Sequence, residues 1–312
     1  MTDLMVTGGS GLLGSAVRRL FPLATFISRH EADLRDRTEV TALFRRVRPR
    51  RVLHLAAWVG GVHANCERNA DFFIDNVLIN TNVLAAAYQE GVERLIGVLS
   101  SCAFPVSDRV VTESDLHTGS PFSGNLGYGY AKRMLDVQVH LMAQQYGWSC
   151  STITPVTMYG PGDNCDPRRS HVVAALIQRC WQAQQEGEPF VVWGSGEAVR
   201  QFVFVDDVAR VLGMLLKSSG GPDSVIVAPD RGITIRRLAE LIAGKMGYHG
   251  PILFDHGKPE GVRVRRLRSA RFSDYFPDFA FTSLEEGLQK TIAWFLGQRA
   301  TRETTDRQQV CQ

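Results

Sequence analysis

A tyrosine and a lysine four residues apart carry the clearest chemical pattern in this chain of 312 residues, Tyr128 and Lys132. Side chains at positions i and i+4 are neighbours on one face of a helix. The ammonium of such a lysine can lower the pKa of the phenol, which can then exchange a proton with a substrate oxygen near neutral pH. Ordinary surface helices also carry such pairs, so the interpretation needs support from other residues.

A glycine-rich segment near the amino terminus supplies that support. The sequence Gly-Gly-Ser-Gly-Leu-Leu-Gly occupies positions 8–14, after an apolar run at 4–6 and before a helix-like apolar pattern. In this context, backbone N–H groups at the start of a helix bind the pyrophosphate of a dinucleotide. The loop and the Tyr/Lys pair together predict hydride chemistry at a carbonyl group.

Length and composition place the chain among ordinary globular proteins. A chain of 312 residues can hold one large α/β unit or two domains, and its 44% apolar and 21% charged residues are usual values. The net charge of +3 is too small to indicate a nucleic-acid partner. Of the 35 basic residues, 30 are arginines, which suits phosphate contacts but is explained equally well by genomic base bias.

The ends and the cysteines bear on location. The first expected strand begins near residue 3, which leaves no room for a signal peptide, and no apolar run is long enough to span a membrane. The six cysteines form neither a C-x-x-C pair nor a zinc-binding spacing. We therefore expect free thiols, no metal site and a reducing, cytoplasmic location.

Apolar runs alternate with helical patterns in the first half of the chain. The expected strands are 3–7, 24–28, 51–55, 94–99 and 150–154, and the expected helices are 11–20, 38–47, 69–90 and 127–145. Strands separated by helices predict an α/β fold, a Rossmann-type parallel sheet with helices on both faces. Right-handed crossovers place the carboxyl ends of the strands at one edge, where ligands bind.

The second half predicts a smaller C-terminal α/β substrate domain. Its expected elements are helices at 170–186, 207–217, 234–246 and 284–298 and strands at 189–193, 201–205, 224–228 and 251–254. Asp206 or Asp207 is expected to cap the helix at 207, and Thr282 or Ser283 the last helix. We expect a dinucleotide-binding domain at 1–160 with a returning segment near 195–217, a substrate domain over most of 161–300, and a disordered tail at 301–312.

The end of the second strand bears on the cofactor. Many dinucleotide folds place an acid there to hold the ribose 2′-hydroxyl. Here the strand end is followed by Ser28, Arg29 and His30, and no acid is expected at that edge. Arg29, assisted by Ser28, is suited to a 2′-phosphate, which favours NADP(H), although Arg29 could also be a solvated loop residue. Asp33, followed by Leu34, could contact the adenine or cap the next helix.

Further segments give the chain a family resemblance. They lie at 53–57, 59–61, 99–102, 128–134, 159–164, 170–172, 192–196 and 258–261. With these segments the chain resembles the extended short-chain dehydrogenase/reductases from about residue 4 to 298. Within them it resembles the bifunctional family that converts GDP-4-keto-6-deoxy-D-mannose to GDP-L-fucose by 3,5-epimerisation and NADPH-dependent 4-reduction.

The resemblance implies roles for five catalytic residues. Cys102 and His171 would be the base and acid that invert C3 and C5, and both groups can titrate near working pH. Ser100 and Tyr128 would stabilise the enolate oxygen at C4, and Tyr128 would protonate that oxygen during reduction. Lys132 would hold the tyrosine and the nicotinamide ribose. Taken alone, a cysteine such as Cys102 is usually a small buried apolar residue, and Ser100 could simply end a strand.

The resemblance also implies binding residues. Arg179 and Arg200 would contact the GDP diphosphate and ribose, and Trp193 and Lys258 would line the substrate site, although a tryptophan closing a strand is more often a core residue. The expected cofactor-binding set is Gly8, Ser10, Gly11, Leu12, Gly14, Ser28, Arg29, Asp33, Leu34, Ala56, Tyr128 and Lys132.

The family also pairs two such chains through the helices at 69–90 and 127–145. The implied assembly is a homodimer. Leu78, Val83, Leu135 and Val139 could form its interface or could be core residues of those helices. Apart from a second copy, the expected partner is the GDP-sugar, with no nucleic acid and no membrane.

Two positions depart from the family pattern. Thr157 ends a Pro-Val-Thr segment where the family has Pro-Thr-Asn, and Cys165 stands where an aromatic residue follows Asp-Asn. These changes leave open a 4-reductase that acts on a related GDP-4-keto sugar with reduced or no epimerase activity. A non-catalytic nucleotide sensor is a third reading, but a sensor has no need of the Ser100, Tyr128 and Lys132 set.

Overall fold

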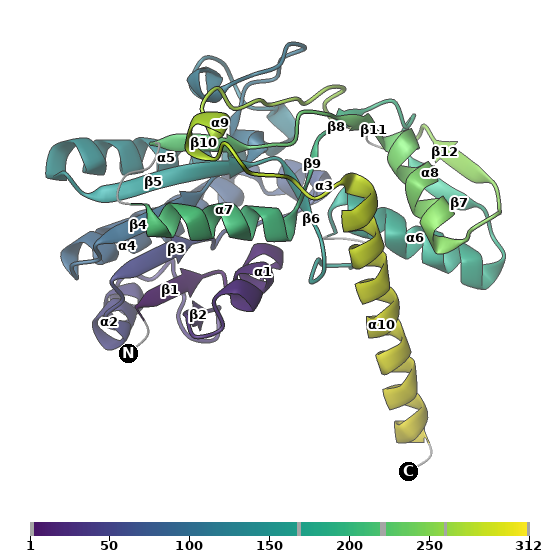
Figure 1. Ribbon diagram of the computed structural model, residues 1–312, viewed down its shortest axis with the longest axis horizontal. Coiled ribbons are helices and arrows are strands. Elements are labelled where there is room, and N and C mark those ends of the chain that lie inside the picture. Colours follow the sequence, from purple (N-terminus) through teal and green to yellow (C-terminus); the bar gives the residue numbers. More distant parts are fainter. Residues whose placement is uncertain (1–2, 167–169, 219–222, 259–260, 311–312) are drawn as a thin grey trace.

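The computed structural model describes residues 3–166, 170–218, 223–258 and 261–310. Its centre is a six-stranded, wholly parallel sheet with the order β10-β5-β4-β3-β1-β2 (Figure 1). These strands are β1 Leu4–Thr7, β2 Thr25–Ile27, β3 Arg51–His54, β4 Arg94–Val98, β5 Ser149–Pro155 and β10 Ser224–Val227. The predicted Rossmann-type parallel sheet is confirmed.

Helices cover both faces of this sheet (Figure 1). On one face α1, Leu12–Leu20, packs against α7, Val205–Lys217. On the other face α4, Asn69–Gln89, packs against both α2, Arg37–Val47, and α5, Leu126–Tyr146. All nine strands and helices expected in the first half are present, with ends within two residues of the expected ones, because apolar periodicity is strong there.

A second set of elements lies beside the sheet (Figure 1). It contains α6 Val172–Glu186, α8 Ile235–Met246, α10 Leu284–Val310 and three strand pairs. The pairs are β7 Phe190–Trp193 with β12 Ile252–Asp255, β8 Val199–Arg200 with β11 Ile233–Thr234, and β6 Thr157–Tyr159 with β9 Phe202–Phe204. The short helices α3 Val62–Glu67 and α9 Phe272–Tyr275 were not expected from the sequence.

The buried apolar residues form two clusters. One fills the space around the six-stranded sheet and includes α7 residues such as Val208 and Leu212. The other joins α6, α8 and α10 through residues such as Ile177, Ile242 and Ile292. The domain limits remain a prediction. The side chains of 302–310 and the whole of 311–312 lie outside the described part of the chain, so the expected disorder of 301–312 also remains untested.

The expected acidic cap of α7 is wrong. Phe204 is the N-cap residue and no side chain caps the helix. Asp207 is buried and accepts hydrogen bonds from the Thr282 N–H and hydroxyl at 2.7 and 3.0 Å and from Arg210 Nη1 at 2.9 Å. Asp207 therefore ties α7 to the start of α10. Ser283 accepts from Glu286 N at 3.2 Å, as expected for a cap of that helix.

The four residues considered for a dimer interface separate in the fold. Val83, Leu135 and Val139 are buried in the core, which supports the core reading for these three, whereas Leu78 is 42% exposed. Other exposed apolar residues on the same two helices include Ile74 and Leu141. Within the described residues, no helix combines the length and the apolar character needed to cross a membrane.

The contact between α4 and α5 needs a glycine at 127. An added Cβ would lie 2.0 Å from Asn69 O, and Gly127 N donates to Asn69 Oδ1 at 2.7 Å. We expect Gly127→Ala to lower the free energy of unfolding by about 1–3 kcal/mol, because the two helices must separate. Urea unfolding measures this change. The matched control is Gly244→Ala in α8, where an added Cβ meets nothing within 4 Å, and we expect it to raise stability by up to about 1 kcal/mol. Equal loss in both variants would contradict the packing argument.

Candidate active site

We call the six-stranded sheet with its helices the first unit and the second set of elements the second unit. Three catalytic candidates of the first unit meet at the carboxyl edge of the sheet. Ser100 follows β4 and is the N-cap of a short 3₁₀ turn, Ser101–Ala103, where its side chain accepts from Cys102 N at 3.2 Å. Tyr128 lies in the first turn of α5 and is hydrogen-bonded to Ser100. Gly129 packs so closely that an added Cβ would lie 2.7 Å from Cys102 O. The structure therefore brings Ser100, Cys102 and Tyr128 together.

The electrostatics of the Tyr/Lys pair differ from the expectation. Burial, together with the charge of Cys102, raises the pKa of Tyr128 well above its ordinary value, and the hydrogen bond from Ser100 opposes this only in part. Lys132 lies 5.9 Å from the centre of the tyrosine ring and donates instead to Val98 O at 2.7 Å. The pKa of the phenol is therefore raised and not lowered as expected, because the loss of phenolate solvation dominates. The phenol keeps its proton, so it is suited to donating one.

Burial also acts on the lysine. Lys132 is 2% exposed, and burial lowers its pKa to about 8. The imidazole of His54 lies buried nearby. Its Nδ1 lies 2.8 Å from Thr7 Oγ1, and its Nε2 lies 3.1 Å from Asn80 Oδ1. Burial and then the charge of Lys132 lower the pKa of His54 to about 3. His54 is therefore neutral and adds no second positive charge beside Lys132.

The fifth candidate, His171, comes from the second unit. It is the N-cap residue of α6, and its Nδ1 lies 3.5 Å from Asp163 Oδ1. The hydrogen bond to Asp163 raises the pKa of His171, with burial acting in the opposite direction. Asp163 is buried, and its second oxygen has no hydrogen-bond partner among the described residues. Asp163 thus favours the protonated form of His171, the form required of a proton donor.

Asp163 had no role in the sequence interpretation. The signal was present, because the residue lies in the matched segment at 159–164. Neither its burial nor its contact with His171, eight positions along the chain, follows from local sequence. The adjacent Cys165, one of the two departures from the family pattern, packs partly buried against the second cluster.

The glycine loop has the geometry of a phosphate cradle. Gly8 has φ +74°, and a Cβ there would lie 2.8 Å from Ala56 N. A Cβ on Gly14 would lie 2.4 Å from Gly8 O. Gly11 is the N-cap of α1, and no side chain caps that helix. Its first backbone N–H groups are therefore available to an anion, so these residues fit a dinucleotide.

The end of β2 differs from the expectation. Ser28 N and Oγ both donate to Glu31 Oε2 at 2.6 Å. A carboxylate therefore does stand at this edge, and the expectation that none would is wrong. The chain turns back after Ser28, as shown by the bond from Glu31 N to Ser28 O at 3.3 Å, and this turn brings Glu31 to the strand end. Arg29 is exposed.

The helix-cap alternative for Asp33 is also wrong. Asp36 caps α2 by accepting from Thr38 N at 2.7 Å and Glu39 N at 3.0 Å. Asp33 forms an ion pair with Arg35 at 2.6 Å, and this contact lowers the pKa of Asp33 to about 2. Leu34 is buried in the first cluster. Contacts of Asp33 and Leu34 with a cofactor remain predictions.

Three of the four substrate-binding candidates converge on one aromatic ring. Trp193, at the end of β7, is 45% exposed. The guanidinium of Arg179, from α6, lies 4.3 Å from the ring centre, and Lys258 Nζ lies 5.7 Å from it. Trp193 is therefore a surface platform with two cations and not a core residue. Arg200 lies apart from this group, since its guanidinium donates to Val199 O at 2.8 Å and to Val262 O.

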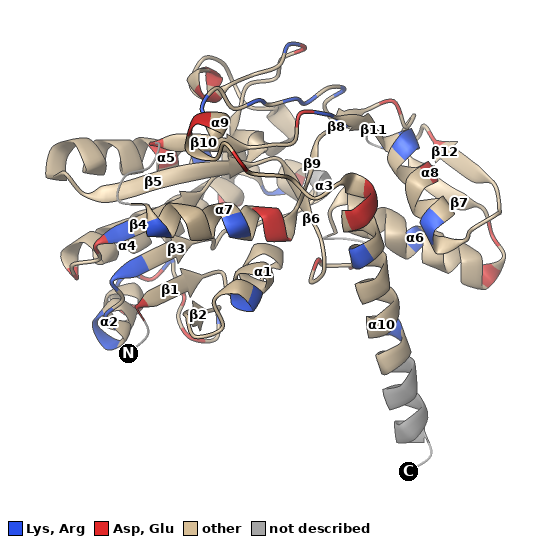
Figure 2. Cartoon of the chain, in the orientation of Figure 1, with Lys and Arg blue, Asp and Glu red and all other residues tan. Residues whose placement is uncertain are grey.

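A run of basic residues lies on the connection before α9 (Figure 2): Arg263, Arg265, Arg266 and Arg268. Arg265 Nη1 donates to Ser101 O at 3.1 Å. The connection that follows Lys258 thus contacts the turn that carries Ser100 and Cys102. This arginine therefore joins the connection to the turn at the carboxyl end of β4.

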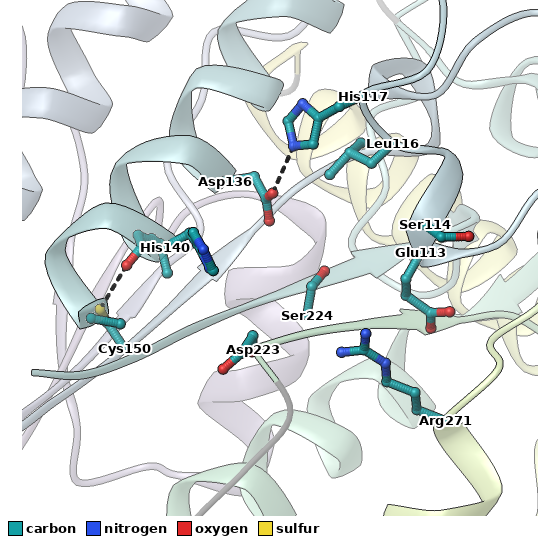
Figure 3. A pocket seen from close by; sticks show the side chains of 12 residues that line it. Glu113, Ser114, Leu116, His117, Asp136, His140, Cys150, Asp223, Ser224 and Arg271 are labelled. Atoms are coloured by element: carbon teal, nitrogen blue, oxygen red, sulfur yellow. Dashed lines mark hydrogen bonds and ion pairs between the residues drawn. The ribbon is translucent and has the colours of Figure 1, made fainter. Parts of the chain in front are cut away.

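A separate cavity of about 200 Å³ contains none of the predicted site residues. It lies near the amino ends of β5 and β10, where Cys150 and Ser224 line it, and His117 points toward Asp136 at 3.0 Å (Figure 3). Within the described part of the chain, no group of three His, Cys, Asp or Glu residues could hold a metal ion. Cys66, Cys102, Cys150, Cys165 and Cys180 are free thiols.

Comparison with known proteins gives the family. The model of the NAD dependent epimerase/dehydratase family matches residues 4–228. GDP-L-fucose synthase 1 of Arabidopsis thaliana is 36% identical, covering 94% of this chain and 93% of that protein. A probable GDP-L-fucose synthase of Drosophila melanogaster is 34% identical, covering 95% and 98%. This chain belongs to the NAD dependent epimerase/dehydratase family, among the GDP-L-fucose synthases.

The structural comparison agrees with that membership. The crystal structure of a GDP-L-fucose synthetase from Naegleria fowleri bound to NADP is 33% identical, with a TM-score of 0.87 over 96% of this chain and 95% of that one. The similarity to GDP-L-fucose synthases therefore extends over both units. The family model ends at 228, so it includes Ser100, Tyr128 and His171 but not Lys258.

The pair of Asp163 and His171 yields a testable outcome. We expect Asp163→Asn to lower the pKa of His171 by about one unit, because the hydrogen bond to a negative partner is lost. Histidine NMR titration measures this pKa. The matched control is Asp136→Asn, which removes the carboxylate beside His117 and should leave His171 unchanged. A His171 titration that is the same in Asp163→Asn and wild type would contradict the pairing.

The buried lysine Lys132 yields a second testable outcome. Of the 5 lysines in the chain, we expect one to titrate near pH 8, protonated below this pH and neutral above it, because burial disfavours the ammonium of Lys132. NMR of chain labelled at the lysine ε-carbon measures the titration. The resonance should be missing in Lys132→Met. Five lysines that all titrate above pH 10 would contradict the burial argument.

Proposed function

We propose that this enzyme converts GDP-4-keto-6-deoxy-D-mannose to GDP-L-fucose with NADPH, by inverting C3 and C5 and reducing the C4 ketone. The observation that carries the proposal is the buried phenol of Tyr128, hydrogen-bonded to Ser100 beside the turn that carries Cys102. The near full-length similarity to GDP-L-fucose synthases from plants and animals supports the choice of substrate.

The glycine loop and its surroundings would hold the cofactor. The start of α1 offers backbone N–H groups to the pyrophosphate, and Lys132 would donate to the nicotinamide ribose. The Naegleria fowleri relative bound to NADP supports NADP(H) as the cofactor. Bound NADPH supplies the hydride that C4 receives.

The protein's part in the reduction is proton transfer to the C4 oxygen. The high pKa of Tyr128 keeps its proton in place until negative charge develops on that oxygen. Ser100 is hydrogen-bonded to the same phenol, so both hydroxyl groups can donate to one oxygen. Lys132 provides a buried positive charge below pH of about 8, and a positive charge favours the phenolate left after the proton is given.

The inversions need proton transfer at carbon. A ketone at C4 acidifies the protons on C3 and C5, and each inversion removes a proton from one face of the sugar and returns one to the other face. Cys102 and His171 come from different units, which allows them to approach the sugar from different sides. Asp163 favours the protonated form of His171, so His171 would return a proton and Cys102 would accept one. The same oxygen donors, Ser100 and Tyr128, would stabilise the enolate in both inversions.

The nucleotide end of the substrate fits the second unit. Trp193 offers an exposed ring for stacking, and Arg179 and Lys258 carry positive charge beside it. These charges suit a diphosphate. Arg200 would act mainly by holding the connection at 262–263 in place, through its bonds to backbone carbonyl oxygens.

We also propose that two copies pair through α4 and α5. Ile74 and Leu141 are each 54% exposed and Leu78 is 42% exposed. Apolar residues of this size on two adjacent helices suit a twofold contact. A cytoplasmic location remains a prediction.

The epimerase step separates this proposal from a simple reductase. We expect the enzyme in heavy water, with GDP-4-keto-6-deoxy-D-mannose and without NADPH, to incorporate deuterium at C3 and C5, because the enolates form before reduction. NMR of the recovered sugar measures the exchange. Cys102→Ser should slow it by about 10²–10⁴-fold. The control Cys66→Ser, which removes an exposed thiol elsewhere, should not.

Two results would contradict the proposal. Reduction of the keto sugar by NADPH with no deuterium at either carbon would identify a 4-reductase without epimerase activity. Unchanged reduction in Tyr128→Phe would remove the role of the phenol.

A further inference from the structure

The carboxylate of Glu31 is fixed at the end of β2 by two short hydrogen bonds. Ser28 N and Ser28 Oγ both donate to Glu31 Oε2 at 2.6 Å. The same hydroxyl accepts from His30 N at 3.3 Å. These bonds lower the pKa of Glu31, so the group is ionised at neutral pH. The N–H and the hydroxyl of Ser28 could each bind a cofactor phosphate, but in the structure both donate to the carboxylate of Glu31.

The strand end that precedes this turn contacts the glycine loop. Gly9 N donates to Ile27 O at 2.9 Å, and a Cβ on Gly9 would lie 2.7 Å from the Cβ of Phe26. Ser28 follows Ile27, so the Ser28–Glu31 turn begins where β2 meets the loop that would hold the pyrophosphate. In dinucleotide folds the adenine ribose lies at this strand end, and a carboxylate there accepts the 2′-hydroxyl.

We propose that Glu31 sets the cofactor preference of this enzyme: its carboxylate accepts the 2′-hydroxyl of NADH and opposes the 2′-phosphate of NADPH. Arg29 acts in the other direction, because an exposed guanidinium beside the same ribose attracts the phosphate. Arg29 and Glu31 thus carry opposite charges, and each favours a different cofactor. The enzyme therefore binds both dinucleotides, and NADPH must displace Glu31 from Ser28 to use the serine donors.

A purely structural role for Glu31 makes a different prediction. In a capping box, the N–H of a serine donates to the side chain of a glutamate three positions later, and this bond stabilises a turn. Ser28 and Glu31 also have this arrangement. If Glu31 only holds the turn, its loss should weaken NADH and NADPH binding equally. If Glu31 faces the ribose, its loss should change the two affinities in opposite directions.

The test compares variants that differ by one charge. Glu31→Gln keeps a side-chain oxygen for Ser28 but removes the negative charge. Glu39→Gln is the matched control, because the Glu39 carboxylate accepts from Asp33 N at 2.8 Å in the same segment and has no bond to Ser28. The dissociation constants of NADPH and NADH are measured by fluorescence titration, and those of adenosine 2′,5′-bisphosphate and ADP by calorimetry.

We expect Glu31→Gln to raise the ratio of the NADH to the NADPH dissociation constant by about tenfold, the effect of roughly 1.4 kcal/mol. The two adenosine probes should change in the same sense, and Glu39→Gln should change either ratio less than about twofold. Glu31→Ala should show the same direction, and its melting temperature reports any damage to the turn.

The inference rests on the proposed dinucleotide site, and the two can fail separately. A wild-type protein that binds neither dinucleotide overturns the proposed function and this inference with it. Binding of NADPH with an unchanged ratio in both Glu31 variants, or an equal loss of both cofactors, overturns the inference alone.

Discussion

The burial of polar side chains at the start of α5 is the constraint on which the site depends. Tyr128 and Lys132 are 8% and 2% exposed, and Gly127 and Gly129 allow the helix to approach Asn69 and the Cys102 turn closely enough to bury them. Removal from water raises the pKa of the phenol and lowers that of the ammonium. Both shifts follow from one cause, namely the loss of solvent around a charged form.

The core behind this helix contains polar groups that are paired with one another. His54 bonds to Thr7 and to Asn80, and Asn80 in turn donates to Ala131 O at 3.3 Å in the turn before Lys132. This chain joins β1, β3, α4 and α5. A buried imidazole is stable here because it is neutral and has partners on both ring nitrogens. The network holds α5 at a set distance from the sheet and thereby positions Lys132.

The candidate site spans the two units of the fold. Ser100, Cys102 and Tyr128 belong to the sheet edge, whereas His171 and the Trp193 platform belong to the second unit. Asp163 positions His171, and Arg265 carries the contact between the substrate unit and the catalytic turn. Each of these links joins residues from separate elements. A change in the packing of the second unit would therefore also move residues of the proposed catalytic site.

The sequence by itself determined the fold class and most of the elements. Apolar periodicity and the glycine loop indicated the parallel sheet, and motif similarity indicated the Ser100, Tyr128 and Lys132 set. The pKa shifts of Tyr128 and Lys132 could not be predicted from the sequence. The same is true of the pairing of Asp163 with His171 and of the position of Glu31 at the end of β2. Asp207 holds Thr282 instead of capping its own helix for the same reason. Periodicity and spacing are local properties that survive in a linear sequence. Burial and long-range pairing depend on which elements pack together, and pKa values and hydrogen-bond partners follow from that packing.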